Sequence, residues 1–96
     1  MGFVQIIELK TSRFGELEAL HEQWRADTEG TRTAVSERIC QDRDNPGTYL
    51  VIVEFPSHEA AMANNDLPAT KRIAEGIAAL ADEPPLFRNL DLVRSE

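Results

Sequence analysis

The chain has 96 residues, which is enough for one hydrophobic core and too few for two, so we expect a single domain over residues 1–96. Hydrophobic residues make up 42% and charged residues 28% of the chain, as in ordinary globular proteins and unlike disordered ones. There are 17 acidic and 10 basic residues, and the basic ones are scattered along the sequence. This balance disfavours nucleic acid and anionic membrane surfaces as partners.

The apolar segments and the single cysteine restrict location and chemistry further. The longest apolar run, residues 49–53, is far too short to span a bilayer. The first residues lead directly into patterned sequence without the features of a signal peptide, which predicts a cytoplasmic protein. Cys40 has no second cysteine to pair with, which excludes an internal disulfide and a thiolate metal cluster.

The first third of the chain predicts a strand followed by a helix. Residues 3–10 are rich in β-branched and apolar side chains, as strands are. Thr11 and Ser12 then offer a helix N-cap, and Gly30 offers a C-terminal stop. Between them, one apolar stripe at helical spacing is formed by Phe14, Leu17, His21 and Trp24.

A hairpin is predicted next. Residues 33–43 form a strand of mixed polarity, and residues 49–55 form a strand that carries apolar side chains on both sides. Asn45-Pro46-Gly47-Thr48 lies between them. Proline fixes φ at the first central position and glycine tolerates a positive φ at the second, which predicts a type II turn.

The last part of the chain predicts two helices and an edge strand. Ser57 caps a short helix, and Pro68 begins a longer one that ends before Pro84. Residues 86–94 alternate as an exposed or edge strand. The inner stripe of the short helix is expected at Ala60, Asn64 and Leu67, and that of the longer helix at Ala69, Ile73, Ile77 and Leu80.

The order β-α-β-β-α-α-β indicates an α+β fold, a ferredoxin-like four-stranded antiparallel sheet with its helices on one face. The strand at residues 49–55 is apolar on both faces, with Leu50 and Ile52 opposing Val51 and Val53. One helical layer covers only one face of the sheet. If the second face stayed in contact with water, the fold would lose several kcal/mol of stabilisation from apolar burial, at about 25 cal/mol per Å². We therefore expect a homodimer.

Residues 49–61, YLVIVEFPSHEAA, resemble the dimeric α+β barrel superfamily, and within it the group similar to antibiotic biosynthesis monooxygenases. The element order extends the resemblance over nearly the whole chain. It implies a dimeric α+β barrel, but the superfamily includes cofactor-independent oxygenases of quinol-like polyketides, haem-degrading enzymes, isomerases and proteins of unknown role.

The sequence departs from its haem-binding relatives. Asn64 stands where many relatives carry a histidine, and no histidine occurs between Asn64 and Glu83, where haem-degrading relatives place the iron ligand. His21 and His58 have no partner at a recognised metal-ligand spacing. We therefore expect neither a cofactor nor a bound metal.

Four residues are candidates for a site. His21 is either a core histidine or a proton-handling catalytic group, and Asn64 is either paired with the backbone or faces a polar occupant of a cavity. Trp24 is either core packing or an aromatic wall for a flat ligand. Tyr49 is either a packing residue or a hydroxyl donor at a cleft mouth.

Two classes of function follow. The first is a cofactor-independent oxygenase acting on a small aromatic or quinol-like substrate, with His21 and Asn64 catalytic and Trp24 and Tyr49 binding the substrate. The alternative is a non-catalytic homodimer that binds a small ligand or serves only as structure. A large pocket holding His21 and Asn64 favours ligand binding, whereas a packed interior favours the structural protein.

Overall fold

The computed structural model describes residues 2–96 and contains the seven expected elements in the expected order. The second and fourth strands are shorter than the predicted 33–43 and 86–94, because only residues 36–41 and 86–91 pair along a neighbouring strand. The elements are β1 (Phe3–Lys10), α1 (Phe14–Asp27), β2 (Ser36–Gln41), β3 (Thr48–Phe55), α2 (His58–Asn65), α3 (Pro68–Leu80) and β4 (Leu86–Asp91).

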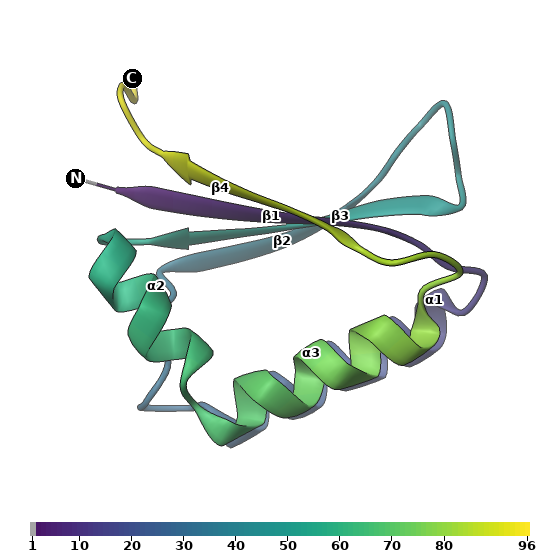
Figure 1. Ribbon diagram of the computed structural model, residues 1–96, viewed down its shortest axis with the longest axis horizontal. Helices are drawn as coiled ribbons and strands as arrows, with labels where there is room; N and C mark the ends of the chain where they lie inside the picture. The colour runs from purple at the N-terminus through teal and green to yellow at the C-terminus, as the bar shows by residue number, and fades with distance from the viewer. Residues whose placement is uncertain (1) are drawn as a thin grey trace.

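The four strands form one antiparallel sheet in the order β2-β3-β1-β4, so β2 and β4 are its edges, and the ferredoxin-like fold is confirmed. All three helices lie on the same side of this sheet, with α1 and α3 running alongside each other (Figure 1). The register pairs Gln5 with Val53 and Ile7 with Val51. These side chains therefore share the face that the helices cover, which we call the inner face.

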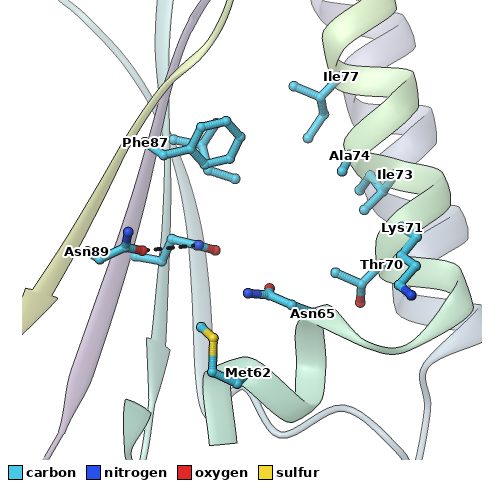
Figure 2. Close-up of a pocket in the computed structure, with 11 residues that line it drawn as sticks. Met62, Asn65, Thr70, Lys71, Ile73, Ala74, Ile77, Phe87 and Asn89 are labelled. Atoms are coloured by element: carbon cyan, nitrogen blue, oxygen red, sulfur yellow. Dashed lines mark hydrogen bonds between the residues drawn. The ribbon is translucent and has the colours of Figure 1, made fainter. Parts of the chain in front are cut away.

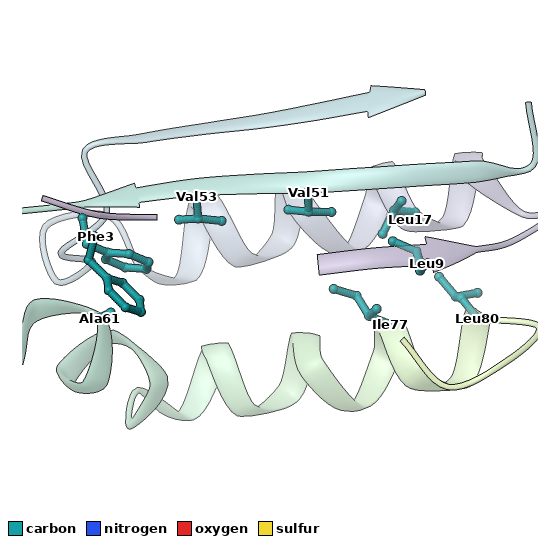
Figure 3. Packing of buried hydrophobic residues seen from close by; sticks show 9 residues of the cluster. Phe3, Leu9, Leu17, Val51, Val53, Ala61, Ile77 and Leu80 are labelled. Atoms are coloured by element: carbon teal, nitrogen blue, oxygen red, sulfur yellow. The ribbon is translucent and has the colours of Figure 1, made fainter. Parts of the chain in front are cut away.

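The hydrophobic core fills the space between the inner face and the helices. Phe3 and Phe55 are tilted against each other with ring centroids 6.4 Å apart, and Phe55 is 2% exposed. Figure 3 shows Val51 and Val53 facing the layer from which Ile77 and Leu80 of α3 project. Burial of both helical stripes against one sheet face is the main apolar stabilisation available within one chain.

The two helix starts differ from each other. Ser57 caps α2 as predicted, since its hydroxyl accepts a hydrogen bond from the Ala60 N–H at 3.1 Å. The predicted cap at Thr11 and Ser12 is wrong, because α1 begins two residues later, with Arg13 at the N-cap and no side-chain cap. The buried Thr11 hydroxyl instead donates to the Leu80 carbonyl at 2.9 Å, which ties the end of α3 to the end of β1.

The hairpin turn forms at the predicted place with a different geometry. Thr48 N–H donates to the Asn45 carbonyl at 2.8 Å, as a β-turn requires. Within residues 2–96 only Gly30 has a positive φ, so Gly47 does not adopt the predicted type II conformation. A type I turn also accepts proline at its first central position. Asp42 holds the residues just before the turn. Its carboxylate accepts a hydrogen bond from the Asp44 N–H at 2.9 Å, which lowers the pKa of Asp42 below its usual value.

Helix α2 is rotated slightly from the expected stripe. Ala61, at 0% exposure, is its most buried residue, whereas Ala60 is only half-buried. Asn64 is on the buried side as predicted, one turn after Ala61. The carboxamide of Asn64 therefore lies inside the layer between sheet and helices.

The other face of the sheet, the outer face, has no covering element. It carries Val4, Ile6, Leu50 and Ile52 from the two central strands, and all four are half-buried. Leu86 and Leu90 of β4 extend the same face and are 55% and 43% exposed. The double apolar character predicted for the central strands is thus present in the structure.

Candidate functional site

A small cavity lies at the centre of the layer between sheet and helices. Its volume is about 60 Å³, and we call it the inner pocket. Apolar side chains from β1, β3 and α3 form most of its wall, and a few polar groups converge on it, which is the usual composition of a small-molecule site. The lining residues are Gln5, Ile7, His21, Trp24, Glu37, Val51, Val53, Phe55, Asn64, Asn65, Thr70, Ile73 and Ile77.

A larger cavity of about 390 Å³, which we call the outer cleft, adjoins the inner pocket. In Figure 2, Phe87 and Asn89 of β4 face Ile73 and Ile77 of α3 across this space. The two cavities share six lining residues and therefore lie next to each other, with the inner pocket as the deep end and the outer cleft as the wide mouth of the candidate site. The shared residues are Gln5, Ile7, Asn65, Thr70, Ile73 and Ile77.

Trp24 is held rigidly at the deep end. Its indole N–H donates to the Thr70 hydroxyl at 2.9 Å, which joins α1 to α3, and the ring is 6% exposed. The His21 ring lies 5.8 Å from it, centroid to centroid, and the Arg32 guanidinium carbon lies 5.8 Å from the Trp24 centroid. A fixed aromatic surface of this kind can form one wall for a flat ligand.

Asn64 is 3% exposed and uses only part of its hydrogen-bonding capacity on the protein. Its carbonyl oxygen accepts from the Thr33 N–H at 3.4 Å, a long bond that ties α2 to the loop before β2. The carboxamide nitrogen remains available as a donor to an occupant of the inner pocket. The bond to the Thr33 backbone is thus present, and Asn64 also lines the inner pocket; a polar occupant of that pocket stays a prediction.

His21 lies beside a buried acid that the sequence analysis did not single out. Its Nε2 is 3.2 Å from Oε2 of Glu37, and the Glu37 side chain is 7% exposed. The contact is short but lies outside hydrogen-bond geometry, so Oε2 receives no hydrogen bond from any residue in the described range 2–96. Arg32 Nε is 3.8 Å from the other oxygen, Oε1.

The pattern that could have identified Glu37 is the alternation of β2. Glu37 and Ile39 are two residues apart and pair with Val53 and Val51, so both point to the inner face. Charged side chains are rarely buried unless they are paired, which makes an inward-facing glutamate a marker of an unusual site. The mixed polarity of the strand alone does not say which side chains face inward.

Tyr49 is remote from the other three candidates. Its ring stacks on Phe14 at the start of α1, with centroids 4.6 Å apart, and its hydroxyl accepts a weak bond from Gln41 Nε2 at 3.4 Å. Trp24 is near the opposite end of the same helix. The structure thus brings His21, Trp24 and Asn64 together and leaves Tyr49 outside the inner pocket and the outer cleft.

No group of three or more His, Cys, Asp or Glu side chains in residues 2–96 is placed to hold a metal ion. Nor does any helix in that range have the length and apolarity needed to cross a bilayer.

Comparison with known proteins places the fold. No family model matches the chain, and no curated protein matches it in sequence. Solved structures do match over nearly the full length. A candidate antibiotic biosynthesis monooxygenase from Caulobacter crescentus has a TM-score of 0.82 at 16% identity, covering 97% of this chain and 91% of that chain.

Two further structures give the same result. SnoaB, a cofactor-independent oxygenase from Streptomyces nogalater solved as a mutant, has a TM-score of 0.82 at 15% identity, covering 98% of this chain and 95% of that chain. A candidate antibiotic biosynthesis monooxygenase from Chloroflexus aurantiacus has a TM-score of 0.77 at 14% identity, with 100% and 97% covered. The chain therefore has the fold of the antibiotic biosynthesis monooxygenase-like proteins, as the resemblance predicted.

Proposed function

We propose that the protein is a cofactor-independent oxygenase acting on a small aromatic, quinol-like substrate bound between the sheet and the helices. The observation that carries the proposal is the inner pocket, where the Asn64 carboxamide and the His21 imidazole face an apolar cavity beside Trp24. That SnoaB, a protein of the same fold, is described as a cofactor-independent oxygenase supports the reaction class.

The chemistry needs a proton acceptor and a donor for an oxygen anion. His21 takes the proton of the substrate hydroxyl, and the Asn64 carboxamide nitrogen donates to the phenolate that remains. The electron-rich ring carbon then transfers one electron to O₂, and the two radicals combine as a peroxide anion, which takes the proton back from His21 to become a hydroperoxide. Loss of water from this hydroperoxide leaves a carbonyl. One oxygen atom enters the product and the other leaves as water, and the substrate supplies all the electrons.

The supporting test is oxygen uptake with anthrone, a fused-ring ketone whose enol is a phenol with a reactive carbon opposite the hydroxyl. We expect the protein to consume one O₂ per anthrone and to form the quinone. In Asn64→Ala, kcat should fall by about a hundredfold, because one donor to the oxygen anion is lost. Asn45→Ala, in the exposed hairpin turn, is the matched control and should behave as the wild type.

The variant requires a folding check, because Asn64→Ala also leaves the Thr33 N–H without its acceptor. Circular dichroism at the assay temperature separates an unfolded variant from an inactive one. Absence of oxygen uptake above the spontaneous rate in the wild type would rule out the oxygenase. If anthrone nevertheless bound beside Trp24, the protein would be a small-ligand-binding module on the same scaffold.

We also propose that two copies of the chain pair through the outer faces of their sheets. Apolar side chains from β1, β3 and β4 gather there with no covering element in one chain. An exposed apolar patch of this kind usually marks an interface. Pairing would convert the open sheet into the dimeric barrel that the resemblance implies, and it would leave the inner pocket within each protomer.

A further inference from the structure

The Glu37 carboxylate is the most unusual polar group in the layer between sheet and helices. Its side chain is 7% exposed, it lines the inner pocket, and Oε2 has no hydrogen-bond donor among residues 2–96. A buried acceptor without a donor costs about 1–3 kcal/mol, and more if it is charged. Such an atom at a cavity wall calls for a donor from outside the chain, which a water supplies in the empty pocket and a ligand supplies when one is bound.

We propose that Oε2 of Glu37 accepts a hydrogen bond from the hydroxyl of the substrate, so that the substrate is an uncharged polycyclic phenol or enol held with this hydroxyl at the deep end of the site. The inference rests on the proposed oxygenase function. It adds the orientation of the substrate and names Glu37 Oε2 as the atom that accepts the hydroxyl proton. The fused rings then extend past Trp24 into the outer cleft, whose walls include Ile73 and Phe87.

The charges around Glu37 favour an uncharged donor over a cation. Arg32 Nε lies 3.8 Å from Oε1 and already offsets the negative charge, and His21 approaches from α1. The positive charge of Arg32 already balances the buried Glu37 carboxylate. A ligand ammonium group would add a second positive charge there and would lose its own hydration on binding. A neutral hydroxyl supplies the missing donor and adds no charge.

The same geometry gives the proton a short route. The hydroxyl O–H bond breaks and the proton moves to Glu37 Oε2. A rotation of the His21 ring, whose Nε2 is 3.2 Å away, then aligns this nitrogen to take up the proton. Glu37 returns to its carboxylate form, and His21 carries the positive charge opposite the new phenolate. The phenolate oxygen keeps the Asn64 carboxamide nitrogen as its donor. In this scheme Glu37 touches the substrate and is a catalytic residue, while His21 stores the proton.

The test compares ligands that differ only in the donor. Binding of naphthol, its methyl ether and naphthylmethylamine is measured by calorimetry on the wild-type protein. We expect naphthol to bind at least tenfold more tightly than the ether, which has no hydroxyl proton, and more tightly than the amine. Equal binding of naphthol and the ether, or tightest binding of the amine, would overturn the proposal without any variant having to fold.

The variant that completes the test is Glu37→Met, which keeps the length of the side chain and removes both carboxylate oxygens. We expect this variant to bind naphthol about as weakly as the ether, so that the tenfold discrimination is lost. Glu59→Met, the same change at an exposed position in the first turn of α2, should keep the discrimination. If Glu37→Met also kept it, Glu37 would not be the acceptor.

The two proposals fail in different ways. If Glu37 discriminates naphthol from its ether but anthrone causes no oxygen uptake, the hydroxyl-binding site is supported and the oxygenase function is ruled out. If oxygen uptake depends on Asn64 but naphthol binds no better than its ether, the oxygenase function is supported and the role of Glu37 is ruled out.

Discussion

We expect the Leu50→Glu variant to be a monomer under conditions in which the wild-type protein is a dimer. Leu50 lies on the outer face opposite Glu8 of β1, so a glutamate there meets a like charge within its own chain and is buried in the proposed interface. Burial of an unpaired carboxylate costs several kcal/mol, and each 1.4 kcal/mol raises the dissociation constant tenfold. We therefore expect the dissociation constant of the dimer to increase by more than a hundredfold.

Light scattering at micromolar concentration measures this directly. The wild type should have twice the 10.8 kDa mass of the chain, and Leu50→Glu should have the mass of one chain. Val35→Glu is the control, because Val35 is 62% exposed and precedes β2. A wild-type protein of single-chain mass, or a Leu50→Glu variant that stays dimeric, would contradict pairing through the outer faces.

Phe55→Ala should be the most destabilising single substitution in the core. Phe55 is 2% exposed and packs against Phe3, so truncation leaves a cavity at the α2 end of the layer. Such a change costs about 3–5 kcal/mol, a large part of the about 5–15 kcal/mol available to a small domain. The midpoint of urea denaturation should fall sharply, and the variant should be partly unfolded at 37 °C.

The comparison is made at equal protein concentration, because a dimer gains stability by mass action. Phe87→Ala is the matched control: Phe87 is 55% exposed on the edge strand, and its truncation should change the free energy of unfolding by about 1 kcal/mol or less. Equal losses in the two variants would contradict the difference in burial between these two inner-face side chains.

The fold could be predicted from the sequence because each element has its own local signal. The stripe that includes Leu17 and Trp24 has a helical period, Ser57 is a cap, and residues 49–53 form an apolar run of strand length. The features that the sequence did not predict are those determined by contacts between residues far apart in the chain. Thr11 was expected to cap a helix, but its hydroxyl instead bonds to the Leu80 carbonyl, far along the chain.

The candidate site could be predicted only in part, for the same reason. His21, Trp24 and Asn64 lie on helical stripes, and a stripe shows which way a side chain points. Glu37 is on an edge strand, and its inward direction depends on the pairing with Val53. Tyr49 also points to the inner face, but its distance from Trp24 is set by the length of α1, which places the two rings at opposite ends of the helix.

The most direct test of the central claim, that a flat aromatic ligand binds between the sheet and the helices, is a fluorescence titration of Trp24 with a hydroxylated anthraquinone. Trp24 is the only tryptophan in the chain, so all tryptophan emission comes from a ring that forms part of the wall of the inner pocket. We expect quenching that saturates at one ligand per chain, with N-acetyltryptophanamide as the control for absorption and collision. Quenching that rises linearly, as it does for the free indole, would contradict the claim.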